Sequence, residues 1–331
     1  MEPTKRFVLD SSRSCNIKCK FCYYLHTYEK WKEYDWSLDK AKGVINDGIA
    51  RGNNYMDVTG GEPTMYKYIC EVVAYALSKD VKTCIITNGI VNKKTVRDLV
   101  SSGVDEFLVS RHGLEKTHNF ITNYKDAYLK QLDFLFSLRT AGIPIRFNCV
   151  INHYNQEEIF AIAKELVHHK PRIVNFINMN PHHEWQDKSI ETGKVAADLD
   201  VVEPLLNKAI KHLEDNGVGV NVRYYPMCRV AEEYRRCICN DRHVVFDPYE
   251  WDYNIEPKTV GAFDNWGKRT SNNVECKNGS CKECDLQNIC GGINKAFDKA
   301  TDYRYTKPVK NFKENKEDFY FYRKDNIRTI T

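Results

Sequence analysis

The chain has 331 residues, of which 42% are hydrophobic and 28% are charged, so it is long enough to bury a substantial core. Its 49 basic and 45 acidic residues leave a formal net charge of +4, which does not favour binding to nucleic acid or to an anionic membrane surface. The sequence shows no secretion signal and no stretch that approaches eighteen apolar residues, so we expect a cytoplasmic protein without a membrane span.

From residue 6 to about residue 180, short β-type runs alternate with longer amphipathic stretches. Strands are predicted over 6–12, 55–59, 82–87, 106–110, 144–151 and 172–179. Helices are predicted over 37–51, 67–79, 93–102, 123–141, 155–169 and 195–216. This alternation is typical of repeated βαβ units, so we expect an α/β fold with a parallel sheet, specifically a partial (β/α)6 barrel. Chemistry in such barrels takes place at the carboxyl ends of the strands.

The alternating pattern ends near residue 226. A short hairpin is predicted over 243–255, and 265–292 is rich in cysteine, glycine and asparagine. We therefore predict three parts: a partial barrel over 1–225, a small cysteine-rich extension over 226–300, and a tail over 301–331 that docks on the body of the protein.

Thirteen cysteines in a chain without a secretion signal indicate metal binding more than a disulfide framework. Ten of them lie in two groups, one at residues 15–22 and one at residues 228–290. The remaining three, Cys70, Cys84 and Cys149, are scattered, and we expect them to be small buried hydrophobic residues.

The first group follows the first predicted strand and consists of Cys15, Cys19 and Cys22. Short spacers let the three thiolates converge on three corners of a [4Fe–4S] cluster, and the fourth iron then has no cysteine ligand. An open coordination position on a metal centre allows a cofactor or substrate to bind. The alternative is a zinc knuckle, which needs a fourth protein ligand, and His26 is the only candidate nearby.

The spacing of these cysteines, with the aromatic Phe21 before the last one, resembles the cluster motif of the radical S-adenosylmethionine (SAM) superfamily. The resemblance implies that SAM binds the open iron through its amino and carboxylate groups. It also implies that the reduced cluster splits SAM to give a 5′-deoxyadenosyl radical, which removes a hydrogen atom from a substrate.

A second motif ends the second predicted strand, where Gly60, Gly61, Glu62 and Pro63 follow one another. Two glycines allow the backbone to approach a ligand closely, and the glutamate supplies an acceptor for an ammonium group. The four residues resemble the GGEP motif of the same family, which implies that they contact the amino group of SAM.

Polar residues also end the next three strands. The third strand ends at Asn88, in a Thr-Asn-Gly sequence that resembles the family, and we expect it to bind the cofactor. The fourth ends at Ser110 and Arg111, and the fifth carries Asn148. The resemblance implies that these positions face the ribose and carboxylate of SAM.

The sixth predicted strand ends with two asparagines, Asn178 and Asn180, which we expect to bind adenine or substrate if alternate residues point into the barrel. The sequence that follows, residues 181–185, contains two histidines and a glutamate. We interpret it as a hydrogen-bonding loop at the barrel mouth and not as a metal site.

The second cysteine group resembles the SPASM and twitch extensions of radical SAM enzymes, which carry auxiliary [4Fe–4S] clusters. We expect one such cluster here, because a further cysteine of the SPASM pattern is replaced by Asn294 and none follows Cys290. Structural zinc bound by the same thiols is the alternative. The expected ligands are Cys276, Cys281, Cys284 and Cys290, with Cys228, Cys237 and Cys239 as further possible ligands.

The combined motifs predict a radical SAM enzyme that uses an external electron donor such as flavodoxin or ferredoxin. Because the cluster motif begins at Cys15, it leaves no room for a preceding peptide-recognition domain. We therefore expect a small polar substrate of the sugar, aminocyclitol or nucleoside type, with net oxidation or rearrangement assisted by the auxiliary cluster. Maturation of a ribosomally made peptide is the alternative reaction, and a non-catalytic iron–sulfur or zinc scaffold is the alternative class of protein.

Overall fold

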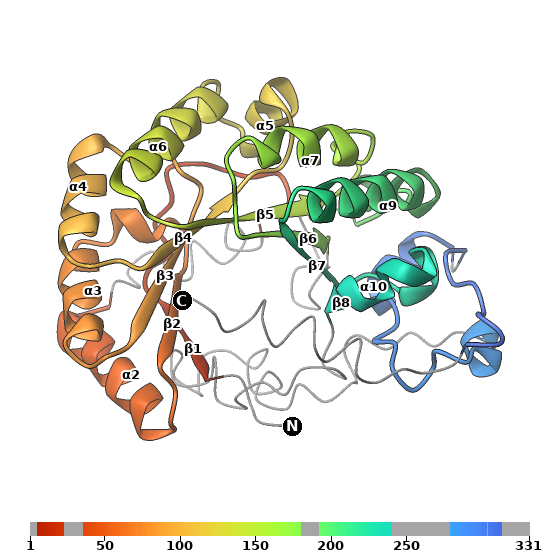
Figure 1. Ribbon diagram of the computed structural model, residues 1–331, viewed down its shortest axis with the longest axis horizontal. Helices are drawn as coiled ribbons and strands as arrows, with labels where there is room; N and C mark the ends of the chain where they lie inside the picture. The colour runs from red at the N-terminus through yellow and green to blue at the C-terminus, as the bar shows by residue number, and fades with distance from the viewer. Residues whose placement is uncertain (1–4, 23–35, 180–191, 240–278, 303, 313–331) are drawn as a thin grey trace.

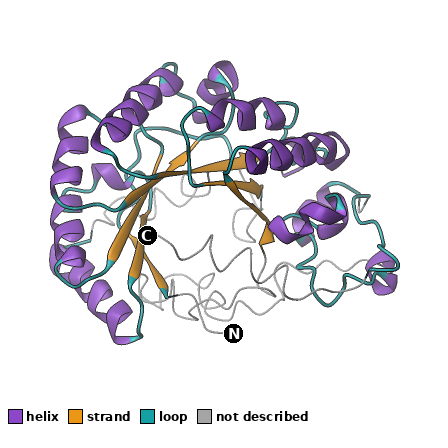
Figure 2. Cartoon of the chain, in the orientation of Figure 1, coloured by secondary structure: helices purple, strands orange, loops and turns teal. Residues whose placement is uncertain are grey.

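A computed structural model describes residues 5–22, 36–179, 192–239, 279–302 and 304–312. In these ranges the strands form one curled parallel sheet, and helices α2 to α9 follow one another along its outer side (Figures 1 and 2). None of the described helices is both long enough and apolar enough to cross a membrane.

Eight strands make up the described sheet, and each pairs in parallel with the next one along the chain. Among the described residues the first and last strands are the two edges of the sheet, so the barrel is not closed. The strands are β1 (Arg6–Asp10), β2 (Tyr55–Thr59), β3 (Lys82–Thr87), β4 (Glu106–Ser110), β5 (Ile145–Ile151), β6 (Ile173–Asn178), β7 (Gly219–Arg223) and β8 (Ile238–Cys239).

Helices connect most of the successive strands. The α-helices are α2 (Leu38–Ala50), α3 (Ile69–Leu77), α4 (Lys93–Ser101), α5 (Glu115–Thr122), α6 (Ala127–Ala141), α7 (Ile159–Val167), α8 (Thr192–Val195), α9 (Leu199–Asp215) and α10 (Lys295–Ala300). The 3-10 helices are η1 (Pro63–Met65), η3 (Met227–Arg229), η4 (Glu232–Cys237) and η7 (Gly279–Glu283).

The predicted α/β fold and partial barrel are confirmed, and all six predicted strands are present. The count of six strands was too low, because β7 and β8 extend the sheet. The predicted helix over 123–141 corresponds to α6, which begins four residues later, and α5 before it was not predicted; α5 ends at Asn123 in the left-handed conformation. The predicted hairpin over 243–255 lies outside the described residues, and the three-part division of the chain stays a prediction.

Polar side chains begin several of the helices. Ser37, Asn92 and Asp198 each accept a hydrogen bond from a backbone N–H in the first turn of α2, α4 and α9, respectively. These bonds satisfy donors that a helix leaves unpaired at its start, which fixes where each helix begins.

The two faces of the sheet differ in chemistry, as β5 shows. Ile145, Phe147, Cys149 and Ile151 are buried in the hydrophobic core beneath the outer helices. The alternate residues of the strand point to the inner face, because successive side chains of a strand point to opposite sides.

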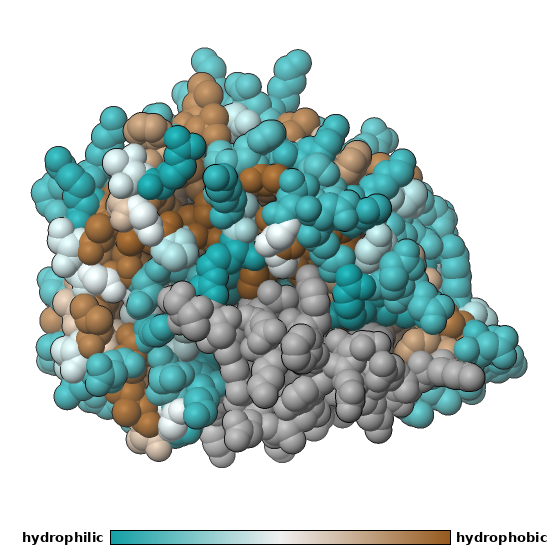
Figure 3. Space-filling model, viewed as in Figure 1, coloured by the Kyte–Doolittle hydropathy of each residue, from teal (hydrophilic) through white to brown (hydrophobic). Residues whose placement is uncertain are grey.

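On the face of the molecule shown in Figure 3, hydrophilic residues cover much of the described surface, with hydrophobic residues between them over the helical layer.

Charged residues fill the inner face near the amino ends of the strands. The guanidinium of Arg146 on β5 lies 2.5 Å from the carboxylate of Glu106 on β4 and 2.7 Å from the hydroxyl of Tyr55 on β2. Asp57 pairs with Arg6 at 2.9 Å and lies 3.8 Å from Arg146. These side chains are largely buried. An ion-paired cluster, and not apolar packing, therefore fills the barrel at the amino ends of the strands, which we call its lower end.

We predict that Arg146→Met destabilises the protein by about 3–5 kcal/mol, because it leaves the buried carboxylate of Glu106 without its closest cation. Urea unfolding of the purified variant measures the change. Lys94→Met is the control, since Lys94 pairs with Asp98 on the exposed surface of α4, and we expect its free energy of unfolding to match that of the wild type. Equal losses in the two variants would contradict a structural role for the cluster.

Candidate active site

The first cysteine group lies in an irregular loop that follows β1 at the carboxyl edge of the sheet. Backbone hydrogen bonds join the start of this loop to the end of β2. Ser11 N–H donates to Thr59 O at 2.9 Å, and Gly61 N–H donates to Ser12 O at 2.7 Å. Glu62 N–H donates to Ser14 O, also at 2.7 Å, next to Cys15. The cysteine loop is therefore held along its first half by the residues after β2.

The two glycines are required by this contact. A Cβ atom on Gly60 would lie 2.4 Å from Ser12 O, and one on Gly61 would lie 2.2 Å from Ser14 O. Gly60 also has a φ of +136°, which residues with a side chain rarely adopt. We predicted that these glycines let the backbone approach a ligand. In the structure they let it approach the backbone of the cysteine loop.

Glu62 is fully buried and joins the ends of β2 and β3. Its carboxylate accepts hydrogen bonds from Asn88 N–H at 2.8 Å, from the Thr87 hydroxyl at 2.7 Å and from Thr64 N–H at 3.1 Å. Burial raises the pKa of Glu62, while these hydrogen bonds act in the opposite direction. Pro63 follows as the first residue of η1. The glutamate positions the loops around the cysteines, and its predicted contact with SAM stays a prediction.

The three thiols of the loop are close enough to affect one another. Burial raises the pKa of Cys15 to about 12, and it raises the pKa of Cys19 well above its ordinary value. Charge repulsion from Cys22 raises both further. The side-chain amide of Asn88 lies 3.9 Å from the Cys15 sulfur, which brings this predicted site residue to the cysteine loop.

The second half of the loop docks on α5. Lys18 N–H donates to Thr122 O at 3.1 Å, and Lys20 N–H donates to Ile121 O at 2.9 Å. The ring of Phe21 meets the ring of His112 edge-on, with centroids 4.9 Å apart. Burial lowers the pKa of His112 to about 3, so this histidine is neutral at physiological pH and acts as a packing partner of the loop.

This donor set fits a [4Fe–4S] cluster. Three partly buried thiols in one loop are the ligands that such clusters use, and burying three thiolates is unfavourable unless cations balance them. Among the described residues, no three His, Cys, Asp or Glu side chains gather closely enough to hold a single metal ion. A cubane keeps its corner irons apart, so its ligands do not need the spacing of a single-ion site.

Two further predicted residues lie on the inner face, next to each other. Ser110 on β4 pairs in register with Asn148 on β5. Arg111 is not with them. Its fully buried guanidinium bonds to Gln131 on α6 and Glu165 on α7 and lies 4.3 Å from the centre of the Tyr128 ring. Arg111 thus lies among the outer helices, and only Ser110 and Asn148 of this predicted group face the barrel interior.

Sequence reasoning missed two asparagines of the inner face. Asn175 on β6 pairs in register with Asn148, and Asn221 on β7 pairs with Asn175. Asn178, which we expected to point inward, lies three residues from Asn175 and therefore on the opposite face, where its amide bonds to Tyr224 O at 3.2 Å. Counting the alternation from Asn148 across the sheet would have found Asn175. Asn180 and residues 181–185 lie outside the described residues.

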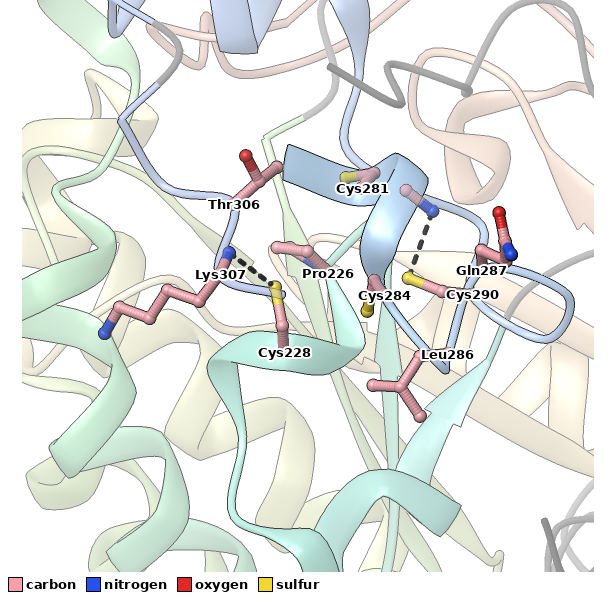
Figure 4. A pocket seen from close by; sticks show the side chains of 10 residues that line it. Pro226, Cys228, Cys281, Cys284, Leu286, Gln287, Cys290, Thr306 and Lys307 are labelled. Atoms are coloured by element: carbon pink, nitrogen blue, oxygen red, sulfur yellow. Dashed lines mark hydrogen bonds between the residues drawn. The ribbon is translucent and has the colours of Figure 1, made fainter. Parts of the chain in front are cut away.

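A second group of cysteines surrounds a small pocket at the end of the chain (Figure 4). Cys228 comes from η3, Cys281 from η7, and Cys284 and Cys290 from the loop that follows η7. Repulsion from Cys290, Cys281 and Cys284 adds to burial in raising the pKa of Cys228 to about 12, so the four sulfurs face a common region.

Backbone N–H groups point at three of these sulfurs. Lys307 N–H donates to Cys228 at 3.4 Å, Val309 N–H donates to Cys284 at 3.3 Å, and Gly292 N–H donates to Cys290 at 3.3 Å. Hydrogen bonds of this kind stabilise thiolates and tune iron–sulfur clusters. The segment 307–309 therefore covers the pocket with donors, although it carries no cysteine itself.

The predicted ligand set for this site is altered in two respects. Cys228 joins the group, whereas Cys237 and Cys239 do not line the pocket, because Cys237 contacts Glu214 of α9 at 3.5 Å and Cys239 ends β8. Cys276 lies outside the described residues. The 52 residues between Cys228 and Cys281 explain why sequence spacing gave Cys228 only as a further possible ligand.

Residues 9–166 match the family model of the radical SAM superfamily. The chain carries a radical SAM domain. This match spans β1 to α7 and includes the cysteine loop, the Gly-Gly-Glu turn, Ser110 and Asn148. The family uses a [4Fe–4S] cluster and SAM, in agreement with the donor set of the loop.

Curated relatives of the radical SAM domain are enzymes of several kinds. Fe-coproporphyrin III synthase of Methanosarcina barkeri is 30% identical over 198 residues, which are 58% of this chain and 49% of the relative. GTP 3′,8-cyclase of Helicobacter pylori is 27% identical over 161 residues, 46% of this chain and 49% of the relative. The chain thus spans about half the length of these relatives.

Solved structures share the fold. Streptococcus suis SuiB has a TM-score of 0.54 at 19% identity, over 66% of this chain and 49% of SuiB. Native anSMEcpe, with bound AdoMet and Kp18Cys peptide, has a TM-score of 0.58 at 13% identity, over 98% of both chains. At these identities the likeness shows the fold of the radical SAM domain and does not show its substrate.

We predict that Gly60→Ala lowers the iron bound per chain after anaerobic reconstitution, because the added Cβ would displace the cysteine loop from β2. Gly52→Ala is a matched control. Gly52 also has a positive φ, +81°, but nothing lies within 4 Å of its Cβ position. Colorimetric iron and sulfide assays measure the effect, and equal iron contents in the two variants would show that the glycine contact does not hold the loop.

Proposed function

We propose that this chain is a radical SAM enzyme whose cluster is bound by Cys15, Cys19 and Cys22. One observation carries the proposal: three partly buried thiols share a loop that the Gly-Gly-Glu turn fixes at the carboxyl edge of the sheet. Catalytic groups of parallel barrels lie at this edge.

Each part of the site has its own task in this proposal. The cysteines bind the cluster, and the amide of Asn88 orients the sulfur of Cys15. Glu62 fixes the ends of β2 and β3, and residues 60–63 form the binding region for the amino group of SAM. Ser110 and Asn148 offer hydrogen bonds to the polar part of SAM from the inner face. The outer helices and the charged cluster at the lower end exclude water from the reaction.

A cluster held by Cys15, Cys19 and Cys22, together with bound SAM, would supply hydrogen-atom abstraction from a substrate, with one electron from an external donor and with methionine and 5′-deoxyadenosine as the products of SAM. Flavodoxin or ferredoxin is the proposed class of donor. The chain's own residues hold and orient the reactants.

A small polar metabolite is the proposed substrate. The inner face of β4 to β7 carries the uncharged polar side chains of Ser110, Asn148, Asn175 and Asn221, which suit a compact hydrogen-bonding molecule. The name of one relative contains GTP, which is a compound of this kind. Maturation of a ribosomally made peptide is the alternative, and peptide substrates form one arm of the assay described below.

We further propose that Cys228, Cys281, Cys284 and Cys290 bind an auxiliary [4Fe–4S] cluster. Four thiols around one pocket complete the ligand set of a closed cubane, and three of the sulfurs already accept N–H donors. Structural zinc is the alternative for this site, so the metal itself must be identified by experiment.

We predict reductant-dependent formation of 5′-deoxyadenosine after anaerobic reconstitution with iron and sulfide. Cys15→Ala is expected to abolish it, because a cluster held at two corners is lost. Cys70→Ala should retain it, since Cys70 is a partly buried cysteine on α3 that belongs to neither group. Liquid chromatography with mass spectrometry quantifies the product. A wild-type protein with a full cluster that never cleaves SAM would remove the proposal.

The substrate is tested in the same assay with pooled polar metabolites in one arm and pooled peptides in the other. In each arm, deuterium transfer from labelled substrate to 5′-deoxyadenosine identifies the molecule that loses hydrogen. Transfer from a peptide alone would replace the small-molecule proposal by the maturase alternative.

The auxiliary site has a separate prediction. In a Cys15/Cys19/Cys22→Ala background we expect about four irons per chain after reconstitution. Adding Cys228→Ala should remove most of this iron, whereas adding Cys70→Ala should not. Zinc in place of iron in the triple variant would reassign the site, and full iron retention after Cys228→Ala would exclude Cys228 as a ligand.

A further inference from the structure

Three asparagine side chains form a continuous row across the inner face of β5, β6 and β7. Asn221 Nδ2 donates to Asn175 Oδ1 at 3.1 Å, and Asn175 Nδ2 donates to Asn148 Oδ1 at 2.9 Å. The three residues are direct neighbours in the register of the parallel strands. Amides joined in this way all point in one direction. The row therefore ends with an acceptor, Asn221 Oδ1, on β7 and with a donor, Asn148 Nδ2, on β5.

The acceptor end of the row is incomplete. Asn221 is 3% exposed, and its Oδ1 atom is buried without a hydrogen-bond partner among the described residues. A buried acceptor without a partner costs about 1–3 kcal/mol, which a fold does not retain without a reason. An N–H or O–H group of a ligand would satisfy this oxygen.

A positive charge lies beside this end. Arg223 is two residues beyond Asn221 on β7, hence on the same face and one step closer to the carboxyl edge. Arg223 is half-buried, and its Nε atom is buried without a hydrogen-bond partner in the described part of the chain. Its neighbour in register on β6 is Ile177, an uncharged residue, so β6 supplies no carboxylate to Arg223 at this position. The guanidinium is therefore suited to an oxyanion.

The charged cluster at the amino ends of the strands is a useful contrast. There, buried carboxylate oxygens without a hydrogen-bond partner also occur, on Asp57 and Glu106, but each lies within 4 Å of an arginine, so the charges balance inside the cluster. Arg223 and Asn221 lie on the same inner face but nearer the edge where the cysteine loop is attached. Asn221 and Arg223 thus carry unpartnered polar atoms on the side of the barrel where a substrate would be expected.

We propose that Asn221 and Arg223 form a substrate-recognition subsite for a small oxyanion, in which Arg223 binds a carboxylate or phosphate and Asn221 Oδ1 accepts a hydrogen bond from the same molecule. Asn175 and Asn148 position the amide of Asn221 through the row. The inference rests on the proposed function and names its substrate class: an anionic metabolite with an N–H or O–H donor close to its acidic group.

Isothermal titration of the reconstituted protein with saturating SAM tests the subsite. Inorganic pyrophosphate is the titrant in one arm and succinate in the other, so that phosphate and carboxylate are distinguished. We expect the wild type to bind at least one of them, and Arg223→Gln to bind it at least about tenfold more weakly, since a charged hydrogen bond contributes about 1.5–3 kcal/mol. Arg139→Gln, with the same charge change on the exposed surface of α6, should bind like the wild type.

Arg223→Lys is the second variant. It retains the charge and loses the planar fork, so we expect binding between that of the wild type and that of Arg223→Gln. Circular dichroism checks that each variant is folded. If Arg223→Gln does not fold, the anion affinity of Arg223→Lys relative to the wild type tests the subsite.

The proposal would be overturned if neither anion binds the wild type, or if anion binding is unchanged in the Arg223 variants. It would also be overturned if Arg223→Gln weakens the binding of SAM by the same factor, because Arg223 would then be a SAM-binding residue. The titration needs no turnover. Anion binding that depends on Arg223 in a protein that does not cleave SAM would leave the subsite standing while the proposed enzyme activity fails.

Discussion

The candidate active site depends on the contact between two turns that have no regular secondary structure. The carbonyl groups of Ser12 and Ser14 in the cysteine loop meet the backbone of Gly60 and Gly61, at distances that leave no space for a Cβ atom. Two backbone hydrogen bonds hold this contact, and the buried carboxylate of Glu62 continues it to β3. Because the loop has no helix or strand of its own, the positions of its thiols follow from this contact and from its docking on α5.

The polar interior of the barrel divides into two regions with different purposes. Near the amino ends of the strands, oppositely charged groups from β1, β2, β4 and β5 satisfy one another, so they contribute to folding. Near the carboxyl ends, an amide row and an arginine keep atoms without partners. The first region is neutralised by its own ion pairs, and the second is the region that we propose to bind a ligand.

The sequence predicted the repeating part of the fold well, because strands such as 55–59, 82–87 and 106–110 are short apolar runs between clear helical patterns. It missed β7, in which only two of five residues are large and apolar, and β8, since two residues carry no periodicity. It also missed α5, whose start at Leu114 has no side-chain cap. The motifs located the cysteine loop, but they could not reveal that Arg111 turns toward the outer helices. That choice depends on Gln131 and Glu165, which are 20 and 54 residues away. From the sequence, Cys228 was only a further possible ligand beside Cys237 and Cys239, because only folding brings it to Cys281.

The neighbour-to-neighbour order of the strands has a consequence for biosynthesis. Among the described residues, the backbone hydrogen bonds that hold the cysteine loop come from residues up to Thr122, so these bonds can form while the later strands are still being translated. The pocket around Cys228 needs the segment at 307–309, which is among the last parts of the described chain to leave the ribosome. A nascent chain would therefore be ready to receive iron and sulfide at its first thiol group well before its second, and the two sites would mature in the order in which they are encoded.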